Sequence, residues 1–91
     1  MATITLPASL QKLALDNKQV KTDEGELLAA LKNLELRYPN LSGKLLTIKS
    51  LPQRYIRVFL NGQDVTDRLN GNQVKITESD HIKILMALAG G

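Results

Sequence analysis

One segment of the chain has helical periodicity, and this single segment limits the folds that the rest can build. Its apolar residues recur at spacings of four, three and four, which is typical of one helix face: Leu27, Leu31, Leu34 and Tyr38. Pro39 ends the predicted helix, because the residue before a proline is pushed out of helical dihedral angles. A helix with one apolar face must bury that face against another element, so the remaining segments are expected to supply a sheet.

The start of this helix is predicted at Asp23. A short polar side chain of this type caps the first turn of a helix, and Glu26 three residues later completes the spacing of a capping box. We therefore expect the helix to run from directly after Asp23 to Tyr38.

Segments on both sides of the helix alternate between apolar and polar residues, the period of two that is typical of strands. Before the helix, "ATITLP" and "KQVKTD" predict a hairpin with a turn at Asp16-Asn17. After it, "RYIRVFL" leads into a hairpin turn at Asn61-Gly62, and two further strands are predicted in "NQVKI" and "HIKILMAL". The long connection "NLSGKLLTIKSLPQ" predicts a short helical turn around Leu45 and Leu46.

The predicted elements follow the order strand, strand, helix, long loop, strand, short strand and strand. One helix covering one face of a sheet is an α+β roll, the shape of the β-grasp or ubiquitin-like fold. We therefore predict a mixed sheet of four to five strands with one main helix. By analogy with that fold, the first and last strands are expected to be parallel neighbours at its centre. At 91 residues the chain is predicted to form a single domain, with residues 87–91 as a flexible C-terminal tail.

Alternation also sorts the strand residues after the helix onto two faces. The aliphatic set predicted beneath the helix consists of Ile56, Val58, Leu60, Ile82, Ile84 and Met86. The uncovered face carries Phe59 and Leu85 with a basic rim of Arg57, Lys83 and His81. Exposed apolar residues of this kind are typical of a protein interface, so we predict these five as partner-binding residues. The alternative is that the loop at 41–53 folds over Phe59 and Leu85 and makes them a second small core.

Composition argues against several classes of partner. The net charge is +3, but the Lys and Arg residues are scattered rather than grouped in the stripe or block typical of nucleic-acid binding. No apolar run approaches the ~20 residues of a membrane span, and the first residues lack the pattern of a signal peptide. The absence of Cys leaves no disulfide and no thiolate ligand. These features predict a cytoplasmic protein without a nucleic-acid or membrane partner.

Side chains that usually carry catalysis are not grouped in this sequence. His81 is the sole histidine, so no histidine pair is present to hold a metal ion. No serine stands in a Gly-x-Ser-x-Gly context, and no glycine-rich segment ends in the Gly-Lys-Ser/Thr of a phosphate loop. Asp64 and Asp67 are interpreted as turn and cap residues rather than paired acids. We therefore predict that the protein is not an enzyme and binds no metal.

The sequence closes with "MALAGG", in which two glycines directly follow an apolar strand. Because glycine has no side chain, a segment ending in Gly90 and Gly91 fits a narrow tunnel in another protein. From Met86 to Gly91, residues of ~3.3–3.6 Å each reach about 20 Å, far enough to join a docking surface to a buried active site. The ionised α-carboxylate is a weak electrophile until ATP converts it to an acyl adenylate. This ending predicts that the reactive group of the protein is the terminal carboxylate of Gly91.

Three stretches together carry a resemblance to a known family: "LELRYPNL" at the end of the helix, "IRVFLNGQDV", and the closing "ALAGG". The last two are specific, since the family typically has a V-x-V-N-G-x-D-[VI] strand and turn and ends in A-[VI]-A-G-G. Over essentially its whole length the chain resembles the prokaryotic ubiquitin-like sulfur carriers. These comprise the small subunit of molybdopterin synthase, the thiamin carrier and, most similar here, the cysteine-biosynthesis carrier. Met86 stands where the carriers often have proline, a departure that leaves the mechanism intact.

The resemblance implies a carrier mechanism. An E1-like enzyme adenylates Gly91 with ATP, the carboxylate becomes a thiocarboxylate, and this group donates sulfur to a biosynthetic enzyme of cysteine or molybdopterin type. Gly90 lets the segment enter these enzymes, and the carrier itself binds no cofactor. It is expected to be a monomer that pairs with both enzymes through the face of Phe59 and Leu85. Two alternatives stay open: a ubiquitin-like modifier joined to target lysines through Gly91, and a non-covalent interaction module.

Overall fold

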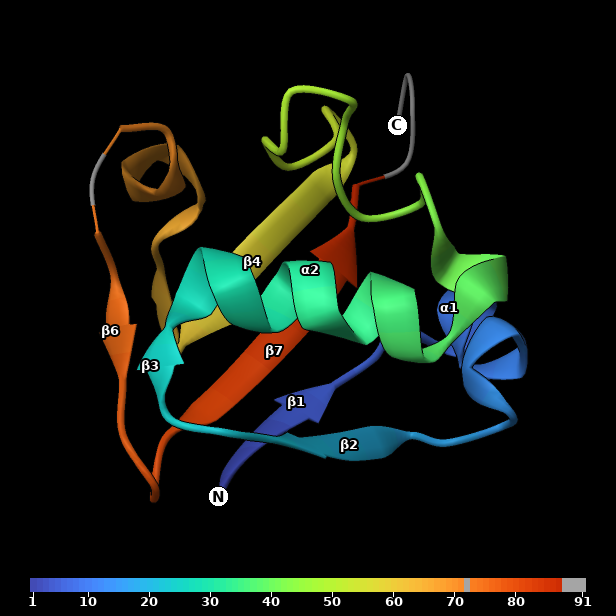
Figure 1. Cartoon of the computed structure of the whole chain (residues 1–91), viewed down its shortest axis with the longest axis horizontal. Helices are drawn as coiled ribbons and strands as arrows, with labels where there is room; N and C mark the ends of the chain where they lie inside the picture. The colour runs from blue at the N-terminus through green and yellow to red at the C-terminus, as the bar shows by residue number, and fades with distance from the viewer. Residues whose placement is uncertain (72, 88–91) are drawn as a thin grey trace.

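A mixed five-stranded sheet in the order β2-β1-β7-β4-β5 forms the centre of the computed structural model, which describes residues 1–71 and 73–87 (Figure 1). Its strands are β1 (Ala2–Thr5), β2 (Gln19–Thr22), β4 (Ile56–Leu60), β5 (Gln63–Asp64) and β7 (His81–Met86). β1 and β7 run parallel, with Ile4 opposite Ile82, and the other neighbours in this sheet are antiparallel. The predicted parallel pair at the centre is confirmed.

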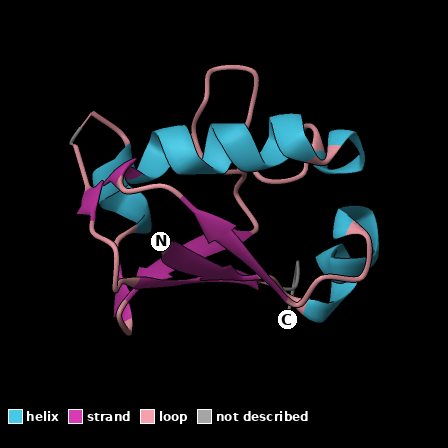
Figure 2. Cartoon of the chain, turned by 60° about the horizontal axis from the view of Figure 1, so that its bottom comes forward, coloured by secondary structure: helices cyan, strands magenta, loops and turns pink. Residues whose placement is uncertain are grey.

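Helix α2 (Leu27–Arg37) lies across one face of this sheet, as Figure 2 shows. Its buried residues recur at helical spacing: Leu27, Ala30, Leu31 and Leu34. They form one core with the inward-facing residues of β1, β4 and β7. Burying a leucine side chain contributes about 1.5–3 kcal/mol relative to exposure, so this contact holds the helix on the sheet. The helix ends before Pro39 as predicted, since Tyr38 already has an extended backbone at φ −122°.

The start of α2 differs from the prediction. The helix begins at Leu27 rather than directly after Asp23, and Glu26 gives it no side-chain cap. The residues in between include β3 (Gly25–Glu26), which pairs with β6 (Lys75–Ile76) in a separate two-stranded sheet. The Leu27 N–H donates to the Val74 carbonyl at 2.7 Å. The capping prediction was wrong because Gly25 and Glu26, which an Asp23 cap needs in the first helical turn, are extended and pair with β6 instead.

The connection between β1 and β2 is more ordered than the turn predicted at Asp16-Asn17. It contains helix α1 (Ala8–Gln11) and the 3₁₀ helix η1 (Lys12–Ala14), and Leu10 on α1 is buried in the core. The chain then reverses through Asp16, which has a φ of 63°. The antiparallel pairing of β1 with β2 is confirmed, but α1 was missed because four residues are too few to show a helical period.

The connection between α2 and β4 has no helical turn at Leu45 and Leu46, contrary to the prediction. After the 3₁₀ helix η2 (Pro39–Leu41), one carboxylate oxygen of Glu35 accepts the backbone N–H groups of Leu45 and Leu46, at 3.0 and 2.9 Å. Leu46 also forms an isolated bridge with Pro52. Because a side chain of α2 takes these donors, the segment packs beside the helix, with both leucines buried.

The turn at Asn61-Gly62 joins β4 to β5 as predicted. Both residues have positive φ, 51° and 88°, the geometry of the two-residue hairpin turn that Asn-Gly favours. The chain then passes through the 3₁₀ helix η3 (Thr66–Leu69) to β6. In the strand predicted in "NQVKI", the described residues 73–76 include one pair of strand residues, Lys75 and Ile76, and these pair with β3 outside the five-stranded sheet.

Candidate functional site

The two glycines predicted to carry the chemistry, Gly90 and Gly91, lie outside the described residues. Ala87 is the last described residue, and its N–H donates to the Tyr55 carbonyl at 2.7 Å. This bond continues the ladder between β4 and β7 one step beyond Met86. The sheet therefore fixes the point from which the glycine-ending segment begins.

β4 and β7 present two different faces, as the alternation predicted. Four of the six predicted inward residues are fully buried, Ile56, Val58, Ile82 and Ile84, while Leu60 and Met86 are half-buried and pack against the core. On the other face, the register places Arg57 opposite Leu85 and Phe59 opposite Lys83. Leu85 is 38% exposed, Lys83 is exposed, and Phe59 and Arg57 are half-buried. These four residues are called the open-face patch below.

The loop at 41–53 leaves Leu85 exposed. Leu41, Leu45 and Leu46 of this loop belong to the core cluster that includes α2, whereas neither Phe59 nor Leu85 belongs to that cluster. Leu85 keeps more than a third of its surface in solvent. The alternative in which this loop buries Leu85 in a second core is therefore wrong, and the role of Phe59 and Leu85 in binding a partner stays a prediction.

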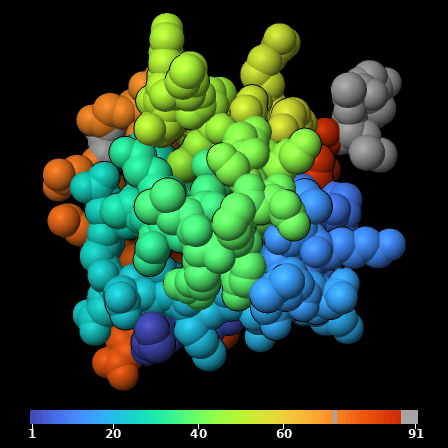
Figure 3. All heavy atoms as spheres, turned by 45° about the vertical axis from the view of Figure 1, so that its right-hand side comes forward, coloured from blue at the N-terminus to red at the C-terminus, as the bar shows by residue number. Residues whose placement is uncertain are grey.

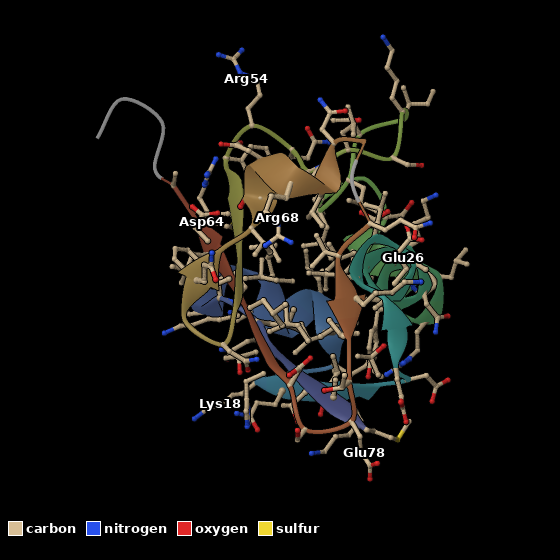
Figure 4. The ribbon with its side chains drawn as sticks, turned by 90° about the vertical axis from the view of Figure 1, so that its left-hand side faces the viewer. Lys18, Glu26, Arg54, Asp64, Arg68 and Glu78 are labelled. Carbon is tan, nitrogen blue, oxygen red and sulfur yellow. The ribbon has the colours of Figure 1, made fainter. Side chains whose placement is uncertain are left out.

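Arg57 makes ion pairs that the sequence did not predict. Its Nε donates to Asp64 Oδ2 at 3.0 Å, and its Nη1 lies 3.6 Å from Asp67 Oδ1. Asp64 also has the turn role predicted for it, since its Oδ1 accepts the backbone N–H and the hydroxyl of Thr66 at 2.9 and 2.7 Å. Figure 4 shows Asp64 on the side of the molecule away from Glu26 and α2. The two carboxylates reduce the positive charge that Arg57 presents on the patch.

The contacts of Asp64 give the fold a dependence on pH. They hold the pKa of Asp64 below its ordinary value, chiefly through the Thr66 hydroxyl and N–H and then through Arg57. A carboxyl pKa that is lower in the folded state stabilises the fold above the unfolded-state pKa, and this contribution is lost as the pH falls through the folded-state pKa. Asp64→Asn is therefore expected to lower the melting temperature at neutral pH, by a difference that shrinks as the pH falls.

Thermal melts at pH ~7 and pH ~3 measure this difference, with Asp67→Asn as the control. The Asp67 side chain is 91% exposed and has only the longer contact to Arg57, so its replacement is expected to change little. A difference between wild type and Asp64→Asn that stays constant with pH would contradict the assignment.

His81 lies at the opposite end of β7 from Leu85, so the structure does not bring these two predicted partner residues together. Four residue steps along the strand, at ~3.3 Å each, place them about 13 Å apart. The His81 N–H donates to Asn61 Oδ1 at 2.9 Å, and Asn61 Nδ2 donates to Asp80 Oδ1 at 2.9 Å. The Asn61 bond is the main cause of a lowered pKa of Asp80. The backbone of His81 thus belongs to the turn that starts β7, and His81 shares its face of the strand with Lys83 rather than lying beside Leu85.

A groove of about 450 Å³ opens beside Ala87 and was not predicted. Its lining residues come from four separate segments: Ser9, Leu10, Leu13, Lys44, Tyr55, Met86 and Ala87. Leu13, Tyr55 and Met86 are half-buried, because each packs against the core and also lines the groove. Figure 3 shows the red end of β7 at the surface, between the blue residues near α1 and the green to yellow residues of the α2–β4 connection. Sequence reasoning missed the groove because α1, which supplies one wall, has no periodic signal.

The sequence profile of the ThiS family matches residues 4–91. The chain belongs to the ThiS family. Among known members of similar sequence, the sulfur carrier protein CysO of Mycobacterium tuberculosis is 29% identical over 92 residues, which cover 98% of this chain and 97% of that protein.

Solved structures show the same fold as this ThiS-family chain. The crystal structure of Mycobacterium tuberculosis CysO matches with a TM-score of 0.80 and 26% identity, over 97% of this chain and 100% of the other. The crystal structure of the BexX/CysO complex of Amycolatopsis orientalis contains a chain that matches with a TM-score of 0.83 and 26% identity, with full coverage of both chains. The small archaeal modifier protein 1 of Methanosarcina acetivorans, at 22% identity, a TM-score of 0.82, and coverage of 99% and 95%, shows a likeness of fold alone. The predicted β-grasp class is confirmed.

Neither a metal-binding cluster nor a membrane-spanning helix is present in the described part of this ThiS-family chain. Residues 1–71 and 73–87 contain no group of three His, Cys, Asp or Glu side chains placed to hold a metal ion. Within the same residues, every helix is too short or too polar to span a membrane.

Proposed function

We propose that this chain is a sulfur carrier protein whose Gly91 carboxylate is converted to a thiocarboxylate. An E1-like enzyme activates the carboxylate with ATP, and the carrier then delivers sulfur to an enzyme of cysteine biosynthesis. The ThiS-family match over residues 4–91 carries the proposal, and the CysO relatives, which align over 98% of the chain, support it. The carrier is a co-substrate of both enzymes rather than a catalyst. We place it in the cytoplasm, where ATP is present.

The proposed chemistry requires activation because a carboxylate is a poor acceptor of nucleophiles. A Gly91 carboxylate oxygen attacks the α-phosphorus of ATP, pyrophosphate leaves, and an acyl adenylate forms. Hydrosulfide then attacks the acyl carbon, and AMP leaves with the former carboxylate oxygen. The chain has no Cys, so no internal thiol competes with hydrosulfide for the activated carbon.

The open-face patch is proposed as the surface that docks on these enzymes. Leu85 and Phe59 supply apolar area near the end of β7, and Lys83 supplies an accessible positive charge. Arg57 is already in an ion pair with Asp64, and His81 lies at the far end of the strand. We therefore assign both residues a smaller role in docking. The BexX/CysO complex supports the idea of a partner protein, because it holds a structurally similar carrier in an assembly.

Intact mass spectrometry tests the proposed function. The protein is incubated with ATP, sulfide and the adenylating enzyme of its host. We expect a mass gain that matches one oxygen replaced by sulfur, and no gain when ATP is omitted. Covalent adducts on other proteins would instead identify a ubiquitin-like modifier. No change with an adenylating enzyme that acts on another carrier would favour the non-covalent interaction module.

Leu85→Asp is expected to raise the KM for the carrier in the activation reaction about tenfold, since an apolar residue at the centre of an interface contributes roughly 1–2 kcal/mol. The melting temperature is expected to change little, because Leu85 is 38% exposed. Ile48→Asp is the control, because the Ile48 side chain is fully exposed and is not part of the patch. A large fall in melting temperature, or an equal rise in KM for both variants, would contradict the assignment.

A further inference from the structure

We propose that the groove beside Ala87 is a second contact for the enzyme that activates Gly91. It receives an apolar side chain of that enzyme, with a carboxylate of the enzyme placed next to Lys44. This inference rests on the proposed function and adds a docking contact on the face of the sheet opposite the open-face patch.

The covalent reach of the chain requires an enzyme close to this groove. Four residues follow Ala87, and at ~3.6 Å each they extend at most about 14 Å. An active site that holds Gly91 therefore has part of its surface within that distance of Ala87. Because Ala87 lines the groove and is tied to Tyr55 by a 2.7 Å hydrogen bond, the groove lies beside the enzyme whenever Gly91 is engaged.

The walls of the groove suit an apolar side chain. Leu10, Leu13, Tyr55 and Met86 supply most of the lining. Of the two polar side chains, the Ser9 hydroxyl already donates to the Met86 sulfur at 2.9 Å. Apolar residues gathered at an open groove mark a surface for an apolar group of a partner, and we assign that group to the enzyme that holds Gly91.

Lys44 determines the charge of the expected occupant. It is the charged side chain that lines the groove, and it makes no salt bridge within residues 1–71 and 73–87. A carboxylate of the enzyme placed beside Lys44 forms an ion pair at the edge of the interface. It also attracts the approaching carrier, whose net charge is +3.

The groove and the open-face patch lie near the same end of β7 on opposite faces. Leu85 points to the patch, and the adjacent Met86 lines the groove. An enzyme that contacts both holds the strand from two sides, which sets the direction in which Gly91 enters the active site. Orientation of this kind is a large part of the advantage of an enzyme-bound reactant.

The test fills the groove from a position outside the core. Ser9→Trp places an indole in the groove from an exposed position of α1, and Ala8→Trp is the matched control at a neighbouring exposed position that does not line the groove. Carrier-dependent exchange between ATP and pyrophosphate is measured with the adenylating enzyme of the host. We expect Ser9→Trp to raise the KM for the carrier about tenfold or more and to keep kcat within about twofold of wild type. For Ala8→Trp, both KM and kcat are expected within about twofold of wild type.

A charge reversal provides a second variant if Ser9→Trp does not fold. Lys44→Glu is expected to raise the KM for the carrier about fivefold at low salt and less at high salt. Lys49→Glu, an exposed residue of the same loop that does not line the groove, is expected to match wild type.

The outcomes separate this contact from the proposed function. The groove contact is overturned if folded Ser9→Trp and Ala8→Trp have equal KM values, or if Ser9→Trp lowers kcat alone. In that case exchange with the wild-type carrier still supports the activation of Gly91. If wild type supports no exchange with an enzyme that is active on another carrier, the proposed function fails, and this contact fails with it.

Discussion

Deleting Gly91, or adding one residue after it, is expected to abolish sulfur loading while leaving the fold intact. Either change moves the reacting carbon by about one residue, ~3.6 Å, and a misplacement of ~1 Å can already cost about a hundredfold in rate. We therefore expect a loss of at least about a thousandfold. The fold is expected to persist, because the core of the described residues extends along β7 only as far as Met86, which packs against it.

Intact mass spectrometry after incubation with ATP, sulfide and the adenylating enzyme measures this loss, and thermal melting checks the fold. The matched control adds one residue before Met1, which lengthens the chain equally and leaves Gly91 unchanged. Sulfur or AMP on the variant that lacks Gly91 would contradict the prediction, because it would show that a terminal carboxylate is accepted one residue earlier, on Gly90.

Leu31→Asp is expected to unfold the protein. Leu31 is 1% exposed at the centre of α2, so the substitution removes apolar packing and buries a carboxylate among aliphatic side chains. The lost packing alone costs about 2–5 kcal/mol, and the desolvated polar group adds several more, in a domain whose total stability is roughly 5–15 kcal/mol. Far-UV circular dichroism and thermal melting record the result.

Leu36→Asp is the control for this prediction. It makes the same chemical change on the same helix, but Leu36 is 79% exposed. A surface substitution of this kind changes stability by about ±0.5 kcal/mol. A cooperative melt near the wild-type temperature for Leu31→Asp would mean that α2 does not bury this face against the sheet.

Local pattern alone predicted the elements that hold the fold together. The apolar spacing from Leu27 to Leu34 identified α2, and alternation sorted β4 and β7 into their two faces. Asn61-Gly62 predicted the β4–β5 turn because few other pairs accept two successive residues with positive φ. The closing "ALAGG" indicated the family, since such motifs are carried in the sequence itself.

Contacts between distant segments decided the rest. Asp23 does not cap α2, because Gly25 and Glu26, which would form the first helical turn after it, pair with the distant strand β6. Leu45 and Leu46 form no helical turn, because the Glu35 carboxylate takes their donors. No local pattern encodes such pairings, since each partner looks ordinary in its own segment.

The surroundings of Ala87 show the same division most clearly. Sequence alone identified the glycines at positions 90 and 91 as the candidate reactive end, and placed Leu85 and Phe59 on one face. The groove exists only because α1, Lys44, Tyr55 and the end of β7 converge in the folded chain. Chemistry that resides in a few consecutive residues can be read from the sequence, whereas a surface assembled from four separate segments appears only when packing brings them together.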